Sequence, residues 1–222
     1  MILLQFSTSH YCRKARLALR YKDIDCRVKN LTPGLHALQL KPLTGCTTVP
    51  VLCPEMPGES EYIADSSCIF RFLERIQPNH PLFPVDPDQK VKAEWLEDWL
   101  DESIGTATRF VYYDYRAGEG KVIDPSFSSQ LVIQVVRRQY GINATTVALA
   151  RERLNLAFQV LSPWQDQDYL CGDRLTIADI TAAALLSPLA LLPEYRQSVP
   201  WLFDRIRAIH QICGEPLPPG LS

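Results

Sequence analysis

The sequence lacks the charge pattern that would direct it to nucleic acids or anionic membranes. Its 222 residues carry 23 basic and 25 acidic side chains, a formal net charge of −2, and the basic residues form no block. Nucleic acids and anionic membranes attract dense runs of lysine and arginine, so we expect neither partner. An apolar fraction of 46% indicates a globular protein with a substantial core.

Long hydrophobic runs are also missing. The longest, residues 180–192, is too short to cross a bilayer and contains Pro188. No basic stretch precedes an apolar one at the N-terminus, so we expect no secretory leader. The expected location is the cytoplasm.

Histidine is scarce, with four residues, and the seven cysteines include no C-x-x-C pair. No spacing among these residues matches a zinc site, so no metal is expected. An odd number of scattered cysteines is typical of reduced thiols in a cytosolic protein.

The first part of the chain alternates between two kinds of pattern. Apolar segments predict strands at residues 2–6, 25–29, 49–53 and 61–63. Helical spacing separates them, clearly at residues 12–19 and 69–76 and weakly at residues 33–40. Strands that alternate with helices predict a small α/β layer.

A segment with four prolines, residues 77–87, separates this layer from the rest. Proline removes backbone donors and disfavours helix, so the segment is typical of an ordered linker, with Leu82 and Phe83 in a groove. The remainder is helical by pattern, with a loop predicted at residues 118–125. Apolar residues recur at helical spacing in three sets: Val91, Trp95 and Trp99; Val147, Ala150, Leu154, Ala157 and Leu161; Leu202, Ile206, Ile209 and Cys213. The predicted division is residues 1–77, a linker at 78–87, and an all-helical domain at 88–222.

Three hydroxyl residues, Ser7, Thr8 and Ser9, lie where the first strand gives way to a helix. Backbone N–H groups at a helix start are unpaired and carry partial positive charge, so a hydroxyl there can help to hold an anion or a thiolate. Ser9 is therefore either a helix cap or a catalytic residue. Cys12, one turn later, is either a small core residue or a redox thiol.

Two further motifs have a structural and a functional interpretation. Val49-Pro50 enters a strand, so it marks either an edge strand or a cis turn that presents the polar groups of Val49 to an extended ligand. Asp65-Ser66 precedes a helix, where it can cap the helix and also hold both ends of an amino-acid zwitterion.

The stretch GDRLTIAD, residues 172–179, is interpreted as a folding determinant. Thr176 and Asp179 have the spacing of a capping box, with aspartate in place of the usual glutamate. The helix that follows is apolar on nearly every side, which is typical of a core helix.

These four elements, in this order, resemble the cytosolic glutathione transferase superfamily, and the resemblance covers essentially the whole chain. It implies an N-terminal thioredoxin-like domain that binds glutathione, an all-helical C-terminal domain that holds the second substrate, and a homodimer. Residues 9–16, SHYCRKAR, look like the segment that begins with the catalytic serine or cysteine. The stretch from Gly172 to Asp179 looks like the family's G-D-x-x-T-x-A-D segment.

The resemblance assigns catalysis to Ser9, and glutathione binding to Ser9, Thr48, Val49, Pro50, Asp65 and Ser66. Glutathione is then a co-substrate. Two positions depart from the family. His10 replaces a proline, and Thr48 replaces the lysine or glutamine that often binds the glycine end of glutathione, a role for which Lys41 or His36 are alternatives. Serine at position 9 argues against the thiol-exchange classes of the family. Cys12 nevertheless occupies the place that the second cysteine of a C-x-x-C motif would take, so a redox role for it stays open.

A second-substrate pocket is predicted on one helix face. Thr106, Arg109, Phe110 and Tyr113 follow one another at helical spacing, so they share a side. The alternative is packing between domains. An aromatic wall suits a hydrophobic electrophile, and Arg109 would steer an anionic one.

The predicted function is conjugation of the glutathione thiolate to small hydrophobic electrophiles, a detoxifying reaction. Two alternatives stay open at this point. One is a glutathione-dependent reductase or peroxidase that works through Cys12 or the bound thiolate. The other is a transferase-like binding protein without activity.

Overall fold

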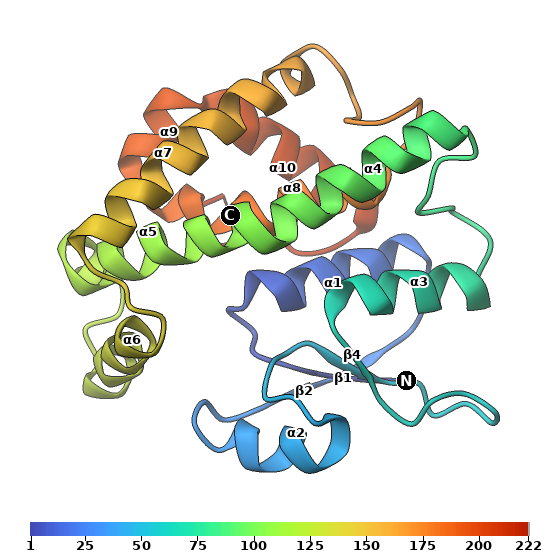
Figure 1. Cartoon of the computed structure of the whole chain (residues 1–222), viewed down its shortest axis with the longest axis horizontal. Coiled ribbons are helices and arrows are strands. Elements are labelled where there is room, and N and C mark those ends of the chain that lie inside the picture. The colour runs from blue at the N-terminus through green and yellow to red at the C-terminus, as the bar shows by residue number, and fades with distance from the viewer. Residues whose placement is uncertain (222) are drawn as a thin grey trace.

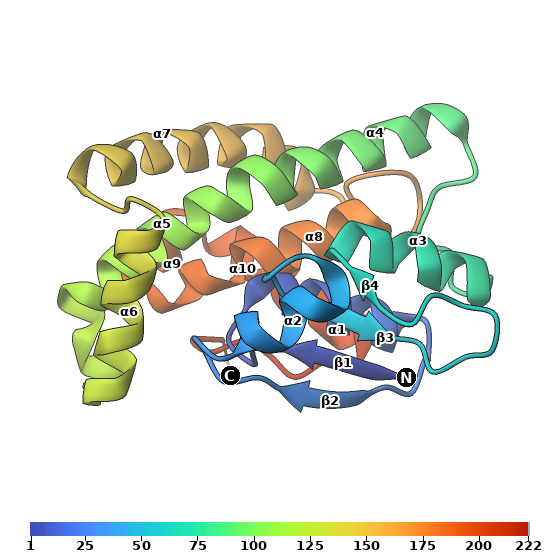
Figure 2. The same ribbon diagram turned by 60° about the horizontal axis from the view of Figure 1, so that its bottom comes forward.

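The computed structural model describes residues 1–221, and its N-terminal part is a four-stranded sheet between helices (Figures 1 and 2). The strand order is β2-β1-β3-β4; β1 runs parallel to β2 and antiparallel to β3, which is antiparallel to β4. The elements of this part are β1 (Ile2–Gln5), α1 (His10–Tyr21), β2 (Arg27–Asn30), α2 (His36–Thr44), β3 (Val51–Cys53), β4 (Ile63–Ala64) and α3 (Ser66–Ile76).

Alternating side chains of the central strands fill two cores. Leu3 and Leu52 point to the face that α1 and α3 cover, whereas Leu4 and Val51 join Leu40 of α2 on the opposite face. This is the period of two that strand geometry imposes. The two central strands are therefore buried on both faces, as the α/β pattern predicts, whereas the edge strand β2 is exposed.

Helices make up nearly all of the second part. They are α4 (Pro87–Trp99), η1 (Leu100–Ile104), α5 (Gly105–Ala117), η2 (Glu119–Ile123), α6 (Phe127–Gln139), α7 (Ala144–Leu161), η3 (Ser162–Gln165), α8 (Ile177–Leu186), η4 (Ser187–Leu191), α9 (Pro193–Ser198) and α10 (Pro200–Cys213). Every residue of α8 is buried, as its apolar pattern predicts. The predicted apolar sets of α7 and α10 are also buried. Among residues 1–221, no helix has the length and apolarity to cross a membrane.

Helices α4 and α5 form one long rod (Figure 1), joined by a single π-helical turn, η1. The buried side of α4 is formed by Ala93, Leu96 and Glu97. Two of the three residues in the predicted apolar set, Val91 and Trp95, are exposed instead. That spacing identified a real helix, but one whose aromatic face points outward.

The proline-rich linker is anchored to both parts of the chain. Leu82 is fully buried; its N–H donates to the Glu74 carboxylate at 3.0 Å, and its carbonyl accepts from the Ile177 N–H at 2.9 Å. Lys22, the buried residue at the end of α1, forms an ion pair with Glu74 of α3. The expected groove therefore exists for Leu82, whereas Phe83 is only half-buried.

Several predicted element bounds were wrong, among them the strands at 25–29 and 49–53, which lie at Arg27–Asn30 and Val51–Cys53. The weak helix at 33–40 lies at His36–Thr44, because Gly34, at a φ of 88°, first completes a turn, and the helix then continues through Pro42 and is capped by Gly45. The strand at 61–63 shrinks to Ile63–Ala64, and the loop at 118–125 contains the 3-10 turn η2. Each error falls at an element end, where turn geometry outweighs composition.

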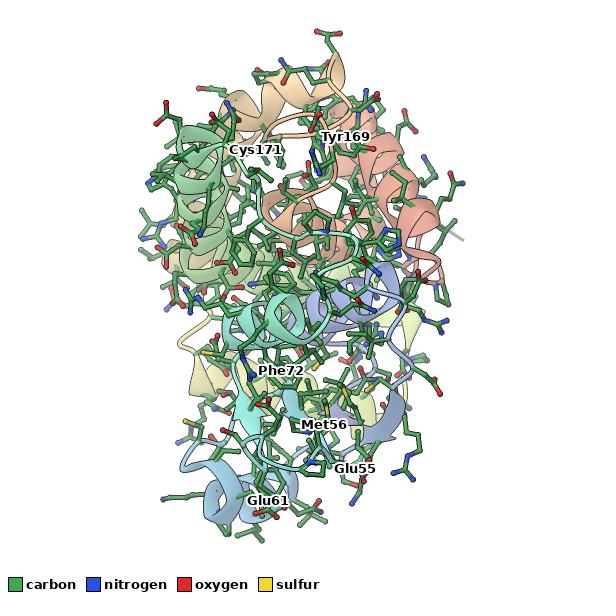
Figure 3. All side chains as sticks on the ribbon, turned by 90° about the vertical axis from the view of Figure 1, so that its right-hand side faces the viewer. Glu55, Met56, Glu61, Phe72, Tyr169 and Cys171 are labelled. Carbon is green, nitrogen blue, oxygen red and sulfur yellow. The ribbon has the colours of Figure 1, made fainter. Side chains whose placement is uncertain are left out.

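The helical part and the sheet lie toward opposite ends of the molecule in Figure 3. Tyr169 and Cys171 lie at the helical end, and Phe72 of α3 lies near the middle. Glu55 and Met56 lie toward the end that holds the sheet.

Candidate functional site

The strand register brings the predicted motifs to one end of the sheet. Leu4 of β1 pairs with Val51 of β3, which pairs with Ala64 of β4. Pro50 and Asp65 are the next residues beyond this row, and the chain turns from β1 into α1 at the same end. The segments that carry Ser9, Val49-Pro50 and Asp65-Ser66 are therefore neighbours, although more than fifty residues separate the first from the last.

Ser9 is the N-cap of α1. Its hydroxyl oxygen accepts the Cys12 N–H at 3.3 Å, and its carbonyl accepts the Arg13 N–H at 3.0 Å. The N–H groups of His10 and Tyr11 have no acceptor in the described chain. Capping uses a lone pair of the oxygen and leaves the hydroxyl hydrogen available to donate. The two interpretations of Ser9 are thus compatible, and the same geometry leaves two backbone donors at the mouth of the helix.

Cys12 has the properties of a core residue. Its side chain is fully buried. Burial raises the pKa of the thiol, although a hydrogen bond with Ser9 partly opposes this. A redox cysteine needs an accessible thiol with a lowered pKa, so this environment argues against the reductase alternative through Cys12.

Asp65 caps α3 from a strained backbone conformation. Its carboxylate accepts the N–H groups of Ser67 at 2.8 Å and Cys68 at 3.0 Å. Its φ is 77°, a region that residues other than glycine rarely adopt and that costs about 1–3 kcal/mol. Ser66 is buried, and its N–H finds no acceptor among residues 1–221. An exposed carboxylate therefore lies beside an unpaired backbone donor, which suits a zwitterion.

The Val49-Pro50 peptide bond is cis. Val49 is half-buried and packs against the core under α2, together with Phe6, while Thr48 is exposed. The two alternatives for the glycine end of glutathione differ in freedom. His36 is engaged by Phe6, at 4.8 Å between ring centroids, and by the Gly34 N–H, whereas Lys41 is exposed on α2.

The predicted second-substrate residues all lie on α5, and each is half-buried. Helix α5 begins directly beside the start of α1. The His10 ring nitrogen Nε2 lies 3.2 Å from the Gly105 carbonyl, and the Tyr11 hydroxyl donates to the Asp101 carbonyl at 2.7 Å. These two contacts hold the mouth of α1 against the face that carries Thr106 and Arg109.

A buried ion network supports this junction, and it was not predicted from the sequence. The Lys14 ammonium is completely buried; it pairs with Glu97 and, at 2.6 Å, with Asp101. The Ser67 hydroxyl donates to the same Glu97 oxygen at 2.6 Å. A lysine on a helix is usually solvated, so its own position does not predict burial. The one available signal was the spacing of Glu97 and Asp101, which lie one turn apart on a partly apolar helix.

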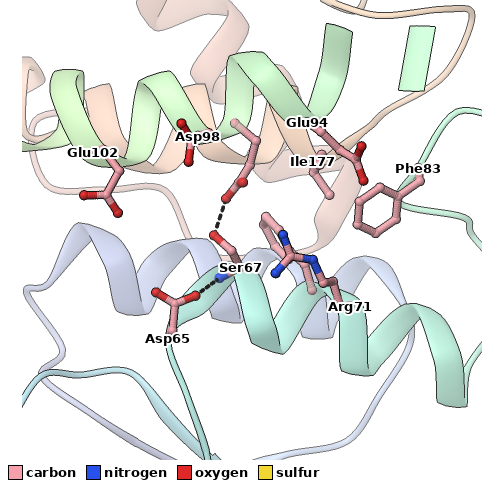
Figure 4. Close-up of a pocket in the computed structure, with 10 residues that line it drawn as sticks. Asp65, Ser67, Arg71, Phe83, Glu94, Asp98, Glu102 and Ile177 are labelled. Atoms are coloured by element: carbon pink, nitrogen blue, oxygen red, sulfur yellow. Dashed lines mark hydrogen bonds between the residues drawn. The ribbon is translucent and has the colours of Figure 1, made fainter. Parts of the chain in front are cut away.

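A cavity of about 210 Å³ opens beside this network, between α3 and α4 (Figure 4). Its acidic lining comes mainly from one stretch of the α4–η1 rod, with Glu94, Asp98 and Glu102. Ser67 and Arg71 face them from α3. The cavity therefore borders the start of α3, where Asp65 also lines it.

The GDRLTIAD segment acts in folding, as the sequence predicts. The buried Asp179 carboxylate accepts the N–H and hydroxyl of Thr176, both at 2.8 Å, and the Leu170 N–H at 2.7 Å. Burial raises the Asp179 pKa to about 6. All three donors belong to the segment that leads into α8, so the carboxylate fixes the start of the core helix.

Comparison with known proteins agrees with this architecture. The chain matches two family models, the glutathione S-transferase N-terminal domain over residues 3–81 and the glutathione S-transferase C-terminal domain over residues 126–206. A solved glutathione S-transferase from Methylobacterium radiotolerans, in complex with glutathione sulfonate, has a TM-score of 0.73 at 24% identity, over 98% of this chain and 94% of that one. This likeness establishes a thioredoxin-like domain followed by an all-helical domain.

Two curated proteins are similar in sequence. FtsZ-localized protein A of Caulobacter vibrioides is 24% identical over 195 residues, which are 85% of this chain and 75% of that protein. Glutathione S-transferase U4 of Arabidopsis thaliana is 28% identical over 108 residues, 46% of this chain and 45% of that protein. The longer match is thus to a protein whose name records a location and not a reaction.

Proposed function

The chain belongs to the cytosolic glutathione transferase superfamily, and from this premise we propose that it joins the thiolate of glutathione to hydrophobic electrophiles. One observation carries the proposal. The Ser9 hydroxyl keeps a hydrogen to donate at a helix start with two unpaired N–H groups, at the sheet end that also holds Pro50 and Asp65. Asp65 and Ser66 would hold the γ-glutamyl end, and the Val49 backbone would pair with the peptide.

The protein's task is to keep the sulfur of glutathione ionised. A free thiol has a pKa of about 8.5. Lowering that pKa by one unit requires about 1.4 kcal/mol of preferential stabilisation of the thiolate. A charge-assisted hydrogen bond from Ser9 contributes about 1.5–3 kcal/mol. The first turn of α1 contains no acidic residue, so its partial positive charge adds to this effect.

The reaction then needs no covalent bond to the protein. The thiolate attacks an electrophilic carbon, a carbon–sulfur bond forms, the leaving group departs with its electron pair, and the thiol proton passes to solvent. The electrophile would lie against the α5 face of Thr106, Arg109, Phe110 and Tyr113. Detoxification in the cytoplasm, a homodimeric state and the domain division at residues 78–87 belong to the same proposal.

Replacement of Ser9 by alanine tests the proposal. We expect kcat/KM for glutathione and chlorodinitrobenzene to fall by at least about tenfold, and the thiolate absorbance of the glutathione complex to titrate at higher pH. Loss of the cap costs only about 1 kcal/mol, so the variant should fold. Ser198→Ala, which removes an exposed hydroxyl at the end of α9, is the matched control and should retain activity.

Two results would contradict the assignment of Ser9. One is a Ser9→Ala variant with the activity and thiolate pKa of the wild type. The other is loss of turnover in Cys12→Ala alone, which would favour the reductase.

A binding protein without transferase activity is the second candidate function. It is favoured by the similarity to FtsZ-localized protein A over 85% of this chain. A wild-type protein that neither stays on immobilised glutathione nor conjugates chlorodinitrobenzene would support it.

A further inference from the structure

Arg109 is an arginine without an acceptor. Its guanidinium carbon lies 5.2 Å from the ring centroid of Tyr11 on α1 and 4.6 Å from that of Tyr140 after α6. It is half-buried, yet within residues 1–221 it forms no ion pair and no hydrogen bond. Every other arginine of that range that is not exposed donates to an oxygen, as Arg16 does to Glu215 and Arg137 to Asp114.

The two rings fix where this cation lies. Stacking against aromatic faces holds the guanidinium plane and leaves its N–H edge free to donate. Tyr11 is itself immobilised, because its hydroxyl donates to the Asp101 carbonyl at 2.7 Å. The positive charge is thus held against Tyr11, which follows Ser9 by two residues on α1. It lies on the α5 face that was predicted to hold the second substrate.

The chemistry of an oriented guanidinium is specific. Its paired N–H groups match the two oxygens of a carboxylate, and such a bidentate contact is stronger and more directional than contact with a neutral group. The nearest acid on the same helix, Asp114, already pairs with Arg137 at 3.2 Å. No side chain of the described chain therefore takes the place that a ligand carboxylate would take.

We propose that Arg109 binds an anionic group, so that the preferred electrophiles of this protein are aromatic or unsaturated molecules that carry a carboxylate. The choice of electrophile rests on the proposed transferase function, whereas the binding of an anion by Arg109 does not. Phe110 and Tyr113, on the same face, would contact the apolar part of such a molecule.

The test compares two aryl chlorides that differ in one group, chloronitrobenzoate and chloronitrobenzamide with the same ring substitution. In both, sulfur displaces chloride and the thiol proton goes to solvent. We expect wild-type kcat/KM to favour the carboxylate, and Arg109→Gln to lower it by at least about tenfold for the carboxylate, with little change for the amide. Arg153→Gln removes the same charge from an exposed position on α7 and should change neither.

A binding measurement separates this inference from the proposed reaction. Calorimetric titration of the full chain with unreactive nitrobenzoate and nitrobenzamide should show tighter binding of the carboxylate, lost in Arg109→Gln, even if no conjugation is detected. That result would keep the anion site and reject the transferase. Equal binding of both compounds, or an unchanged preference in Arg109→Gln, overturns the inference whether or not the protein is a transferase.

Discussion

Asp65 caps a helix and is proposed to bind glutathione, and one substitution can separate these two roles. Its carboxylate caps α3 through Ser67 and Cys68, from a backbone conformation with a φ of 77°. Asparagine tolerates positive φ and keeps an oxygen for the cap, but it carries no charge. We therefore expect Asp65→Asn to change the free energy of unfolding by less than about 1 kcal/mol, and to raise the KM for glutathione by about tenfold, because the γ-glutamyl ammonium loses its ion partner.

The measurements are denaturant unfolding and the KM for glutathione at fixed electrophile concentration. Asp124, a half-buried aspartate that accepts backbone and serine hydrogen bonds near the start of α6, provides the control in Asp124→Asn. An unaltered KM in Asp65→Asn would remove Asp65 from the glutathione site.

At the scale of the element, the start of α1 depends on a neutral histidine. His10 is buried against the Gly105 carbonyl of α5, and burial, together with the positive charges of Arg109 and Arg13, lowers its pKa from 6.5 to about 3. The unfolded chain therefore takes up a proton near pH 6.5 that the folded chain refuses. The stability that neutral His10 contributes is complete above that pH and is lost as the pH falls toward 3.

We expect this group to make wild-type stability fall by about 2 kcal/mol between about pH 7.5 and about pH 5. His10→Asn, which can still donate to the carbonyl, should lose that part of the pH dependence. His80→Asn removes an exposed histidine and should keep the wild-type slope. Parallel urea titrations of the three proteins at both pH values give the free energies of unfolding. The same pH dependence of that free energy in His10→Asn as in the wild type would contradict the role of His10.

The order of elements was predictable from the sequence, whereas the contacts between them were not. Alternation of apolar segments located β1 through α3, because period and turn residues are local properties. The burial of Lys14 and the tie from Tyr11 to Asp101 depend on residues about ninety positions apart. The π-helical turn η1 was missed as well, since nothing in the sequence LDESI distinguishes it from an α-helical turn.

In the candidate site, too, local motifs were predictable from the sequence and contacts between distant residues were not. Ser9, Pro50 and Asp65 were identified from short motifs, and the register explains why they are neighbours. Tyr140 was missed, because its role requires the chain to return from α6 to the face of α5. The sequence also suggested Arg109 for an anion, but only the structure shows it without an acceptor in residues 1–221.

Across the whole molecule, the two parts are joined at both ends of one interface. At one end Leu82 links Glu74 to Ile177, and at the other His10 contacts Gly105. The buried pair of Lys14 and Glu97 lies on the same α1 surface. Because α1 contacts both parts, a shift of the helical part would also displace Ser9, so the proposed glutathione site and the proposed electrophile site are linked through one junction.

The outer face of α4 provides the last prediction, on assembly. Val91 is 66% and Trp95 58% exposed, and the Trp95 ring stacks on Trp99 at 6.0 Å between centroids. Beside this face lies the cavity in which Arg71, without an ion pair in residues 1–221, faces acids such as Glu94. A two-fold contact brings the same surface of two copies together, so each Arg71 can face the acids of the other copy.

We therefore expect a homodimer through this face of α4. Trp95→Arg should weaken it by at least about tenfold, because a large aromatic side chain at the centre of an interface contributes most of its energy. Sedimentation velocity over a range of protein concentrations measures the effect. Leu149→Arg, at a position 51% exposed on α7, is the control and should remain dimeric. A monomeric wild type, or a Trp95→Arg variant that dimerises as tightly as the wild type, would show that this face has another role.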